Sequence, residues 1–519
     1  MVRKKLPIGI QTFAQIREDG CYYVDKTGYA QELVEQGKAY FLSRPRRFGK
    51  SLFLDTLAEM LAGHKTLFEG LACYDTWDWD MVYPVVRISF GAGVVSDRDH
   101  LTVRIEEILT QNARRLGVPV EPGTVAGRFA ALIQGARAVH GQRVVVLVDE
   151  YDKPILDNIT RTEVAGQIRD GLRDLYSVLK DTDEHIKFVM LTGVSKFSKV
   201  SLFSGLNNLK DITIDPRYSA VCGYTEHDVD TVFAAELEGL DRDEVREWYN
   251  GYNWTGEAVY NPFDLLLLFD KRQLEPFWFE TSTPTFLLDM MVEQQTYLPA
   301  LADLETSGPA LSTFEVGDVS AVAVLFQTGY LTIASTRRIG ATVQYLMKYP
   351  NQEVRTSLAG AMLDYLRPVT RQPPGTDLFT LYDHLVAGNL DGIHTFVRTM
   401  FSAIPTDWHR KNDIDQYEGY YASVFYAYFA SLAVDITTED ASSTGRLDMA
   451  VRVADHTYLF EFKTVETSPD GEALRQIKDR HYADKYLADG TTVHLVGVEF
   501  STEKRNVVAF DTETITPQV

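Results

Sequence analysis

Short apolar runs alternate with helical patterns over the first part of the chain. The segments SLFLDTLAEMLAG (51–63) and EVAGQIRDGLRDLYSVLK (163–180) repeat their apolar positions with a helical period. The runs between such segments are continuous and rich in β-branched residues, which is typical of strands buried on both faces of a parallel sheet. We therefore predict a doubly wound α/β domain over residues 1–225. Its expected strands are KAYFLS (38–43), PVVRISF (84–90), RVVVLVDEY (143–151) and IKFVMLTGV (186–194).

Strand-like runs become rarer after residue 225. The stretch TEHDVDTVFAAELEGLDRDEVREWYNGY (225–252) has a helical pattern, and FEVGDVSAVAVLFQTGYLTI (314–333) follows it. We predict a mostly helical lid with a small winged-helix-like end over residues 226–345. From residue 346 to 519, helices precede a β-hairpin, a further helix and a strand, which predicts a second α/β domain.

Composition narrows the class of protein. Three cysteines in 519 residues are too few and too scattered for a disulfide framework or a zinc site, which favours reduced thiols in a cytoplasmic protein. No apolar run approaches the roughly 18 residues that span a membrane, and no apolar segment of a signal peptide follows the basic start MVRKKLPIGI. The net charge of −22 argues against a basic coat but is compatible with a local positive stripe that binds nucleic acid.

The segment SRPRRFGKS (43–51) ends like a phosphate-binding loop and lies between an expected strand and an expected helix. In such a loop, backbone N–H groups at the helix start cradle phosphates. Lys50 would reach the β- and γ-phosphates, and the hydroxyl of Ser51 would hold Mg²⁺. Arg44 stands where the usual pattern opens with glycine, so we predict a variant loop. The extra arginines of this loop either contact phosphates or lie on the surface.

A second signal lies about 90 residues further on. The strand RVVVLVDEY ends in Asp149 and Glu150, and we expect it beside the strand that leads into the loop. Asp149 would hold Mg²⁺, and Glu150 would polarise the attacking water. Thr192, near the end of the fourth strand, either senses the γ-phosphate or caps the strand end. The residues predicted to bind ATP are Arg44, Arg47, Phe48, Gly49, Lys50, Ser51, Asp149 and Thr192.

A third group of chemistry-bearing residues lies near the C-terminus. The alternating segments LDMAVRV (447–453) and TYLFEFKTV (457–465) predict a hairpin that turns at Ala454-Asp455. This turn would place Asp448 opposite Glu461, with Lys463 on the same face; a longer loop would instead pair Asp448 with Lys463. Two carboxylates at one place favour a bound cation, and Mg²⁺ prefers oxygen ligands. The alternative is a cross-strand salt bridge on a solvated face.

These motifs resemble those of a family of bacterial AAA-ATPase-like proteins with a C-terminal PD-(D/E)XK nuclease domain. In that family an arginine-rich phosphate loop is normal. The resemblance implies an ATP-binding and ATP-hydrolysing domain coupled to a metal-dependent nuclease. It covers nearly the whole chain, through YYVDKTGYAQELVEQGKAYFLSRPRRFGKSLFLDTL, LVDEYDKPI, LTGVSKFSKVSLFSGLNNLKDIT, WYNGYNW, VYNPFDLL, FQTGYLTI and YPNQEVR.

The resemblance also implies three accessory residues. Glu418, at the start of a helix, would complete the metal shell; alternatively, it is an acid favoured there by the helix dipole. Gln476 and Tyr482, on the helix after the hairpin, would position nucleic acid or the lysine, while Tyr482 is also explained by core packing.

We therefore expect an enzyme that uses ATP and Mg²⁺, with Mn²⁺ as a substitute at the nuclease site. Its catalytic residues would be Glu150, Asp448, Glu461 and Lys463, and its substrate nucleic acid, DNA rather than RNA. ATPases of this kind often complete the site with an arginine of a neighbouring copy, so a homo-oligomer is also expected. The alternative is a nucleotide-switched regulatory or assembly protein that binds nucleic acid or protein without cutting.

Overall fold

The chain folds into two compact units. The computed structural model describes residues 3–119, 122–196, 202–203, 208–277, 285–294, 296–312, 314–315, 318–366, 374–402, 418–441, 445–466, 468–487, 490–504 and 506–516. The first unit comprises Met1–Ser282 and Glu305–Leu346, and the second comprises Thr283–Leu304 and Met347–Val519. Residues 283–304 therefore pack with the second unit rather than with the middle region that the sequence suggested.

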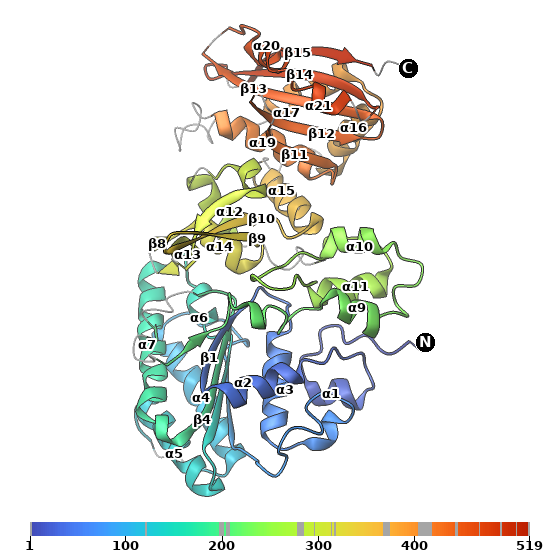
Figure 1. Ribbon diagram of the computed structural model, residues 1–519. Coiled ribbons are helices and arrows are strands. Elements are labelled where there is room, and N and C mark those ends of the chain that lie inside the picture. The colour runs from blue at the N-terminus through green and yellow to red at the C-terminus, as the bar shows by residue number, and fades with distance from the viewer. Residues whose placement is uncertain are drawn as a thin grey trace. The chain divides into compact units, whose positions relative to one another are not determined.

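A parallel sheet of five strands organises the first unit, and the strands lie in the order β2-β3-β4-β1-β5. Their apolar side chains are buried on both faces, as expected for a sheet covered by helices. Figure 1 shows α2 and α3 on one side of this sheet and α4, α5 and α7 on the other. The strands are β1 (Ala39–Ser43), β2 (Val85–Ser89), β3 (Val144–Asp149), β4 (Ile186–Gly193) and β5 (Lys210–Asp211). The helices include α1 (Phe13–Glu18), α2 (Thr27–Gln36), α3 (Lys50–Leu61), α4 (Arg98–Leu116), α5 (Val125–His140), α6 (Lys153–Leu156) and α7 (Thr162–Asp181).

The strand order corrects one expectation. The acidic strand β3 does not lie beside β1, because β4 separates the two strands. Parallel strands end at the same edge of a sheet, so Asp149 at the end of β3 still shares an edge with the loop that follows β1. The two strands are therefore not neighbours, although their carboxyl ends lie at the same edge of the sheet.

Helices and a small sheet form the rest of the first unit. The helical pattern at 225–252 is interrupted: α9 (Glu226–Val232) and α10 (Arg242–Tyr249) are separate, and Asp241 caps the second. They pack with α11 (Pro262–Lys271) around a shared apolar cluster. A second sheet has the order β6-β10-β9. It comprises β6 (Leu304–Ser307), β9 (Thr332–Ile339) and β10 (Thr342–Lys348), and α13 (Gly308–Ser312) and α14 (Ala321–Thr328) precede β9 in the chain.

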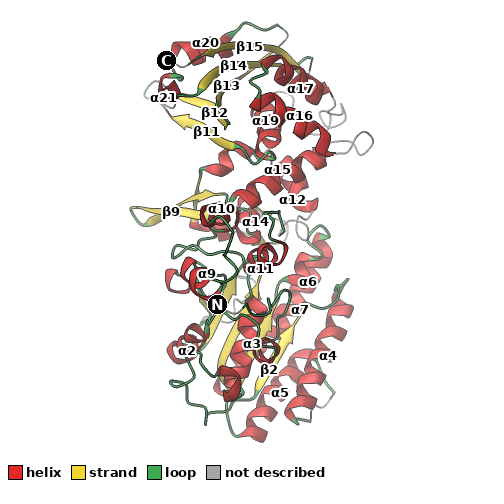
Figure 2. Ribbon diagram, turned by 90° about the vertical axis from the view of Figure 1, so that its right-hand side faces the viewer, coloured by secondary structure: helices red, strands yellow, loops and turns green. Residues whose placement is uncertain are grey.

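The second unit is built on a mixed sheet with the order β11-β12-β13-β14-β15, in which only β13 and β14 are parallel neighbours. In the part of the chain that the structure describes, no helix has the length and apolarity needed to cross a membrane. The strands are β11 (Asp435–Ala441), β12 (Arg446–Val453), β13 (His456–Val465), β14 (Thr492–Ser501) and β15 (Asn506–Ile515). The helices include α12 (Thr285–Glu293), α15 (Gln352–Leu366), α16 (Pro374–Val386), α17 (Leu390–Ser402), α19 (Glu418–Ala430), α20 (Glu472–Asp479) and α21 (Asp484–Leu487). Figure 2 shows the strands of this sheet with helices packed against them.

Gly497 allows α20 to approach the sheet closely. It lies on β14 directly beside Glu461 of β13. A Cβ atom at this position would lie 2.8 Å from the Cα of Leu474, on the first turns of α20. Only a residue without a side chain therefore fits, and the close approach places Gln476 over the same face as Glu461.

We expect Gly497→Ala to destabilise the second unit by about 1–3 kcal/mol, because backbone atoms of α20 cannot yield as a side chain would. Thermal unfolding of the full chain measures this change. Gly360→Ala is the matched control: Gly360 lies in α15, and a Cβ there meets nothing within 4 Å, so this change should leave stability equal or slightly higher. An equal effect of the two substitutions would contradict the packing argument.

Candidate nucleotide and metal sites

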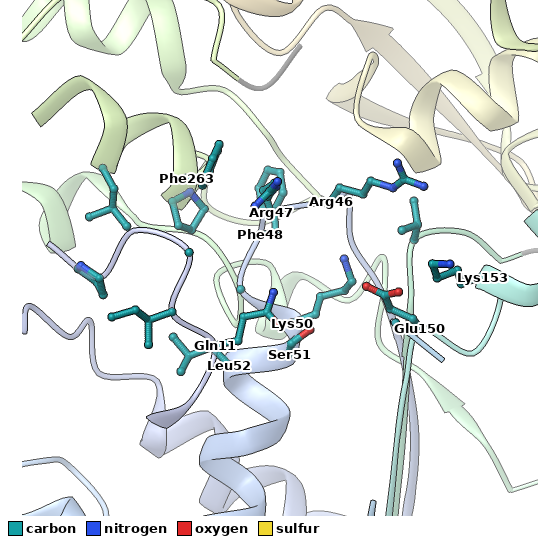
Figure 3. Close-up of a pocket in the computed structure, with 18 of the residues that line it drawn as sticks. Gln11, Arg46, Arg47, Phe48, Lys50, Ser51, Leu52, Glu150, Lys153 and Phe263 are labelled. Carbon is teal, nitrogen blue, oxygen red and sulfur yellow. The ribbon is translucent and has the colours of Figure 1, made fainter. Parts of the chain in front are cut away.

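A cavity of about 460 Å³ lies in the first unit where the loop after β1 meets the start of α3. Its wall includes the loop residues from Arg46 to Leu52, together with Glu150 and Asp152 from the end of β3. Apolar groups, among them Ile10 and Phe263, line another part of the wall (Figure 3). The cavity thus combines cations, carboxylates and an apolar wall in one space.

The loop is shaped for a helix start that faces a ligand. Gly49 precedes α3 with a φ of 86°, a left-handed conformation that glycine adopts without strain. Lys50 is buried, and its Nζ donates to the carbonyl oxygens of Arg44 and Pro45, each at 2.8 Å. Burial lowers the pKa of Lys50. Ser51 follows on the first turn and lines the cavity, so lysine and hydroxyl occupy the places that the sequence predicted.

Arg44 is buried beside the loop and contacts the protein itself. Its guanidinium is fully buried and donates to the carbonyl oxygens of Ser43, Thr213 and Tyr218, each at 2.9 Å. It also lies 3.9 Å from the ring centroid of Trp254, a favourable cation–π contact. Its Nη1 and Nη2 groups thus donate to protein carbonyls, so its side chain fastens the loop.

Phe48 has a similar structural role. It is buried, and its ring packs edge-on against Tyr252 and Trp254. Among the arginines of the loop, Arg46 and Arg47 line the cavity. Arg47, with a φ of 68°, lies over the ring of Phe263 at 4.3 Å. Our sequence set therefore missed Arg46, although its position in the same basic run was a usable signal.

Asp149 and Thr192 are bound to each other at the ends of β3 and β4. The hydroxyl of Thr192 donates to Oδ1 of Asp149 at 2.7 Å, and Thr192 is fully buried. The hydroxyl of Thr192 thus orients the carboxylate of Asp149 at the ends of the two strands. Glu150 lines the cavity, and its carboxylate makes no hydrogen bond to the described residues. Burial and the neighbouring Asp149 raise the pKa of Glu150.

Two residues that follow Glu150 were missed by the sequence analysis. Asp152 is buried and accepts hydrogen bonds from the N–H and hydroxyl of Ser195, at 2.7 and 2.6 Å. Lys153 lines the cavity and donates to the carbonyl of Gly93 at 2.7 Å. The repeated charges in the segment DEYDK (149–153) were the signal. Figure 3 shows Lys50 and Glu150 in the same part of the cavity, with Lys153 on the far side of Glu150 from Lys50.

The second candidate site lies on the hairpin of β12 and β13. The strands turn at Ala454-Asp455, and Val453 pairs with His456. The same register brings Asp448 opposite Glu461, and Oδ2 of Asp448 accepts from the backbone N–H of Phe462 at 2.7 Å. The pairing is the one that the shorter turn predicts.

Glu461 is the most constrained carboxylate of this site, with 1% of its side chain exposed. Its Oε1 accepts from Nζ of Lys463 at 3.1 Å and from Nε2 of Gln476. Its Oε2 is buried without a hydrogen-bond partner among the described residues. Burial and the nearby Asp448 raise the pKa of Glu461 to about 7. A buried acceptor of this kind is costly, and the pair of carboxylates fits a divalent cation with oxygen ligands.

Of the other predicted members of the metal site, only Gln476 contacts a carboxylate of the site in the described part of the chain. Within the described residues, no group of three acidic, histidine or cysteine side chains is arranged to hold a metal. Glu418 begins α19, but its side chain lies outside the described part. Tyr482 is buried in an apolar cluster, and its hydroxyl donates to the carbonyl of Arg446 at 2.9 Å. This is the packing role that we weighed for Tyr482, whereas Gln476 contacts the carboxylate directly.

The raised pKa of Glu461 predicts a pH dependence of stability. Between pH 4.5 and about 7 the folded chain retains a proton that the unfolded chain has lost. Without divalent cations, stability should therefore fall as pH rises through this window, by up to about 3 kcal/mol. Thermal unfolding in a chelator from pH 4.5 to 8 measures this change. The unfolding transition of the second unit is identified as the one that Gly497→Ala shifts to lower temperature. Glu461→Gln should flatten the dependence, and an unchanged slope in this variant would contradict the assignment.

Comparison with known proteins identifies the families of the two regions that carry these candidate sites. Residues 7–203 match the family model of predicted AAA-ATPases. Residues 416–510 match the model of the PD-(D/E)XK nuclease superfamily. An uncharacterized protein in the vnfD 5′ region of Azotobacter chroococcum mcd 1 is 60% identical over 518 residues, which are 99% of this chain and 100% of that protein. The chain therefore belongs to the family of AAA-ATPase-like proteins that carry a C-terminal domain of the PD-(D/E)XK nuclease superfamily.

Proposed function

We propose that this protein binds and hydrolyses ATP in its first unit and cleaves nucleic acid, DNA rather than RNA, in its second. The observation that supports the nuclease most directly is the buried Oε2 of Glu461, which has no hydrogen-bond partner among the described residues and lies beside Asp448 and Lys463. A carboxylate oxygen in such surroundings suits a cation. The three cysteines are buried free thiols, which agrees with a cytoplasmic location.

In the proposed ATPase, the start of α3 receives the phosphates. Lys50, which now holds carbonyl oxygens of its own loop, would turn its ammonium to the β- and γ-phosphates. Arg46 and Arg47 would add positive charge, and Ser51 with Asp149 would hold Mg²⁺. Glu150 would accept a proton from the attacking water, because its carboxylate faces the cavity and its raised pKa favours proton uptake.

In the proposed nuclease, Asp448 and Glu461 would hold Mg²⁺ or Mn²⁺. A divalent cation there supplies Lewis-acid polarisation of the scissile phosphate and a more acidic bound water. Lys463 would move its ammonium from Oε1 of Glu461 to the phosphate oxygens or the water. Gln476 would keep Glu461 in position from the side of α20.

We expect Asp448→Asn to lower the rate of cleavage of labelled DNA in Mg²⁺ or Mn²⁺ by about 100-fold or more. Even residues that only support metal ligands contribute 10–100-fold. Single-stranded and duplex DNA and RNA are incubated with and without ATP. Asp455→Asn is the matched control, since Asp455 is an exposed acid at the turn of the same hairpin. Lys463→Ala should behave like Asp448→Asn.

ATP hydrolysis should be lost in Lys50→Ala and kept in Asp448→Asn, because the two sites use different residues. Lys65→Ala removes an exposed lysine of the same unit and should leave hydrolysis unchanged. If the Lys50→Ala variant also loses DNA cleavage, then cleavage in the second unit depends on the ATP site of the first. ATP hydrolysis without cleavage under any condition, with Lys463→Ala also tolerated, would overturn the nuclease and favour a nucleotide-switched binding protein.

A further inference from the structure

The hairpin of β9 and β10 carries an exposed arm, defined here as residues 334–343. All ten residues of the arm are exposed, including Ile339 at 52% and Val343 at 39%. Its base is fixed: the backbone N–H of Asn253 donates to the hydroxyl of Thr332 at 2.6 Å, and Ile333 is buried. Figure 2 shows the β9 hairpin extending clear of the neighbouring helices of the first unit. Two strands that are solvated on both faces are stable only marginally, so the arm is displayed and not part of a core.

The charge of the arm is opposite to that of the chain. Residues 332–348 contain Arg337, Arg338 and Lys348 and no acidic residue, whereas the whole chain has a net charge of −22. Neither arginine forms an ion pair with a residue that the structure describes; Arg338 donates only to the carbonyl of Gly340 at 3.1 Å. Hydroxyl groups at 335, 336 and 342 add further donors. The arm therefore offers cations and donors without competing acids.

We propose that this arm binds the backbone of duplex nucleic acid, at a contact separate from the Asp448–Glu461 site. A two-stranded ribbon fits the major groove of a duplex, and guanidinium groups bind phosphate oxygens through paired hydrogen bonds. The inference takes nucleic acid as the partner from the proposed function, but it does not require that the second unit cuts.

The test measures binding of a labelled 30-base-pair duplex in chelator and in the Asp448→Asn background, so that cleavage plays no part. Replacing Arg337 and Arg338 with alanine should weaken binding about 10-fold at moderate salt. The slope of log K against log salt concentration should become less steep by about 2, since two phosphate contacts are lost. Replacing both with lysine should retain most of the slope. ATP hydrolysis should be unchanged in both variants.

The matched control removes two other exposed arginines of the first unit, Arg114 and Arg143, and should leave affinity and slope unchanged. Equal affinity and slope after removal of Arg337 and Arg338 would overturn the proposal. So would arginine-dependent binding to phosphatidylserine vesicles with none to the duplex. If removal of the two arginines weakens duplex binding but the natural protein cleaves under no condition, the proposal for the arm stands and the proposed nuclease activity is rejected.

A separate observation concerns the connection between the ATP cavity and the arm. Asp152, at 1% exposure, lines the cavity and accepts two hydrogen bonds from Ser195. The next residue, Lys196, donates its N–H to Oε1 of Gln327 at 2.7 Å. Nε2 of Gln327 donates to the carbonyl of Leu311 at 2.8 Å. Buried groups thus join the cavity to α13 and α14, and α14 leads directly into β9.

We infer that this chain of hydrogen bonds transmits the nucleotide state of the cavity to α14 and the base of the arm. Ser195 and Lys196 are adjacent, so a ligand that moves Asp152 would also move the backbone N–H of Lys196 that holds Gln327. Asp152 and Gln327 are positioning residues in this scheme. The coupling needs two arrangements of the loop that a ligand favours unequally.

Hydrogen–deuterium exchange of peptides from α14 and β9 tests the coupling, with and without a slowly hydrolysed ATP analogue. The analogue should change exchange in the natural protein, and Gln327→Leu should abolish that change while the affinity for the analogue stays within about 3-fold. Thr328→Val is the control, because the hydroxyl of Thr328 bonds only within α14. A preserved response in Gln327→Leu would overturn the inference.

Discussion

Buried and partly buried carboxylates on or next to the strands are the constraint on which both sites depend. Removing a charge from water is costly unless an opposite charge or a hydrogen bond compensates it. In the first unit, Thr192 binds Asp149 and Ser195 binds Asp152. In the second, Lys463 and Gln476 share one oxygen of Glu461, and the other oxygen has no partner in the part of the chain that the structure describes. Asp149 and Asp152 at the first sheet thus each have a hydrogen-bond partner, whereas Glu461 at the second keeps one oxygen that suits a cation.

The buried arginine of the phosphate loop changes how that loop is held. A loop that opens with glycine takes its shape from backbone freedom, whereas Arg44 is anchored by three carbonyl oxygens and by Trp254. Two of these carbonyls and the tryptophan belong to segments beyond the parallel sheet. The position of the loop is therefore linked to the segments that follow β5. A movement of those segments would shift the loop, and a movement of the loop would shift them.

The second site depends on packing against a helix as much as on the hairpin. Gly497 lets α20 lie close to β14, and Glu499 accepts from the backbone N–H of Asp470 and Ala473 at the start of that helix. The helix then presents Gln476 to Glu461. Carboxylate geometry is consequently set by a glycine and an acid on a neighbouring strand, neither of which bears directly on the proposed chemistry.

Much of this arrangement followed from the sequence, because periodicity and residue spacing act locally. Apolar runs located β1 to β4 within one or two residues, and the Ala454-Asp455 turn determined that Asp448 pairs with Glu461. The hydrogen-bond partners of Arg44 and Thr192 did not follow, nor did the place of β4 between β1 and β3. Those features depend on which distant backbone atoms a side chain meets after the strands assemble. The local pattern decided which residues share a strand or a turn, and only tertiary packing decided which polar groups satisfy one another and which remain for a ligand.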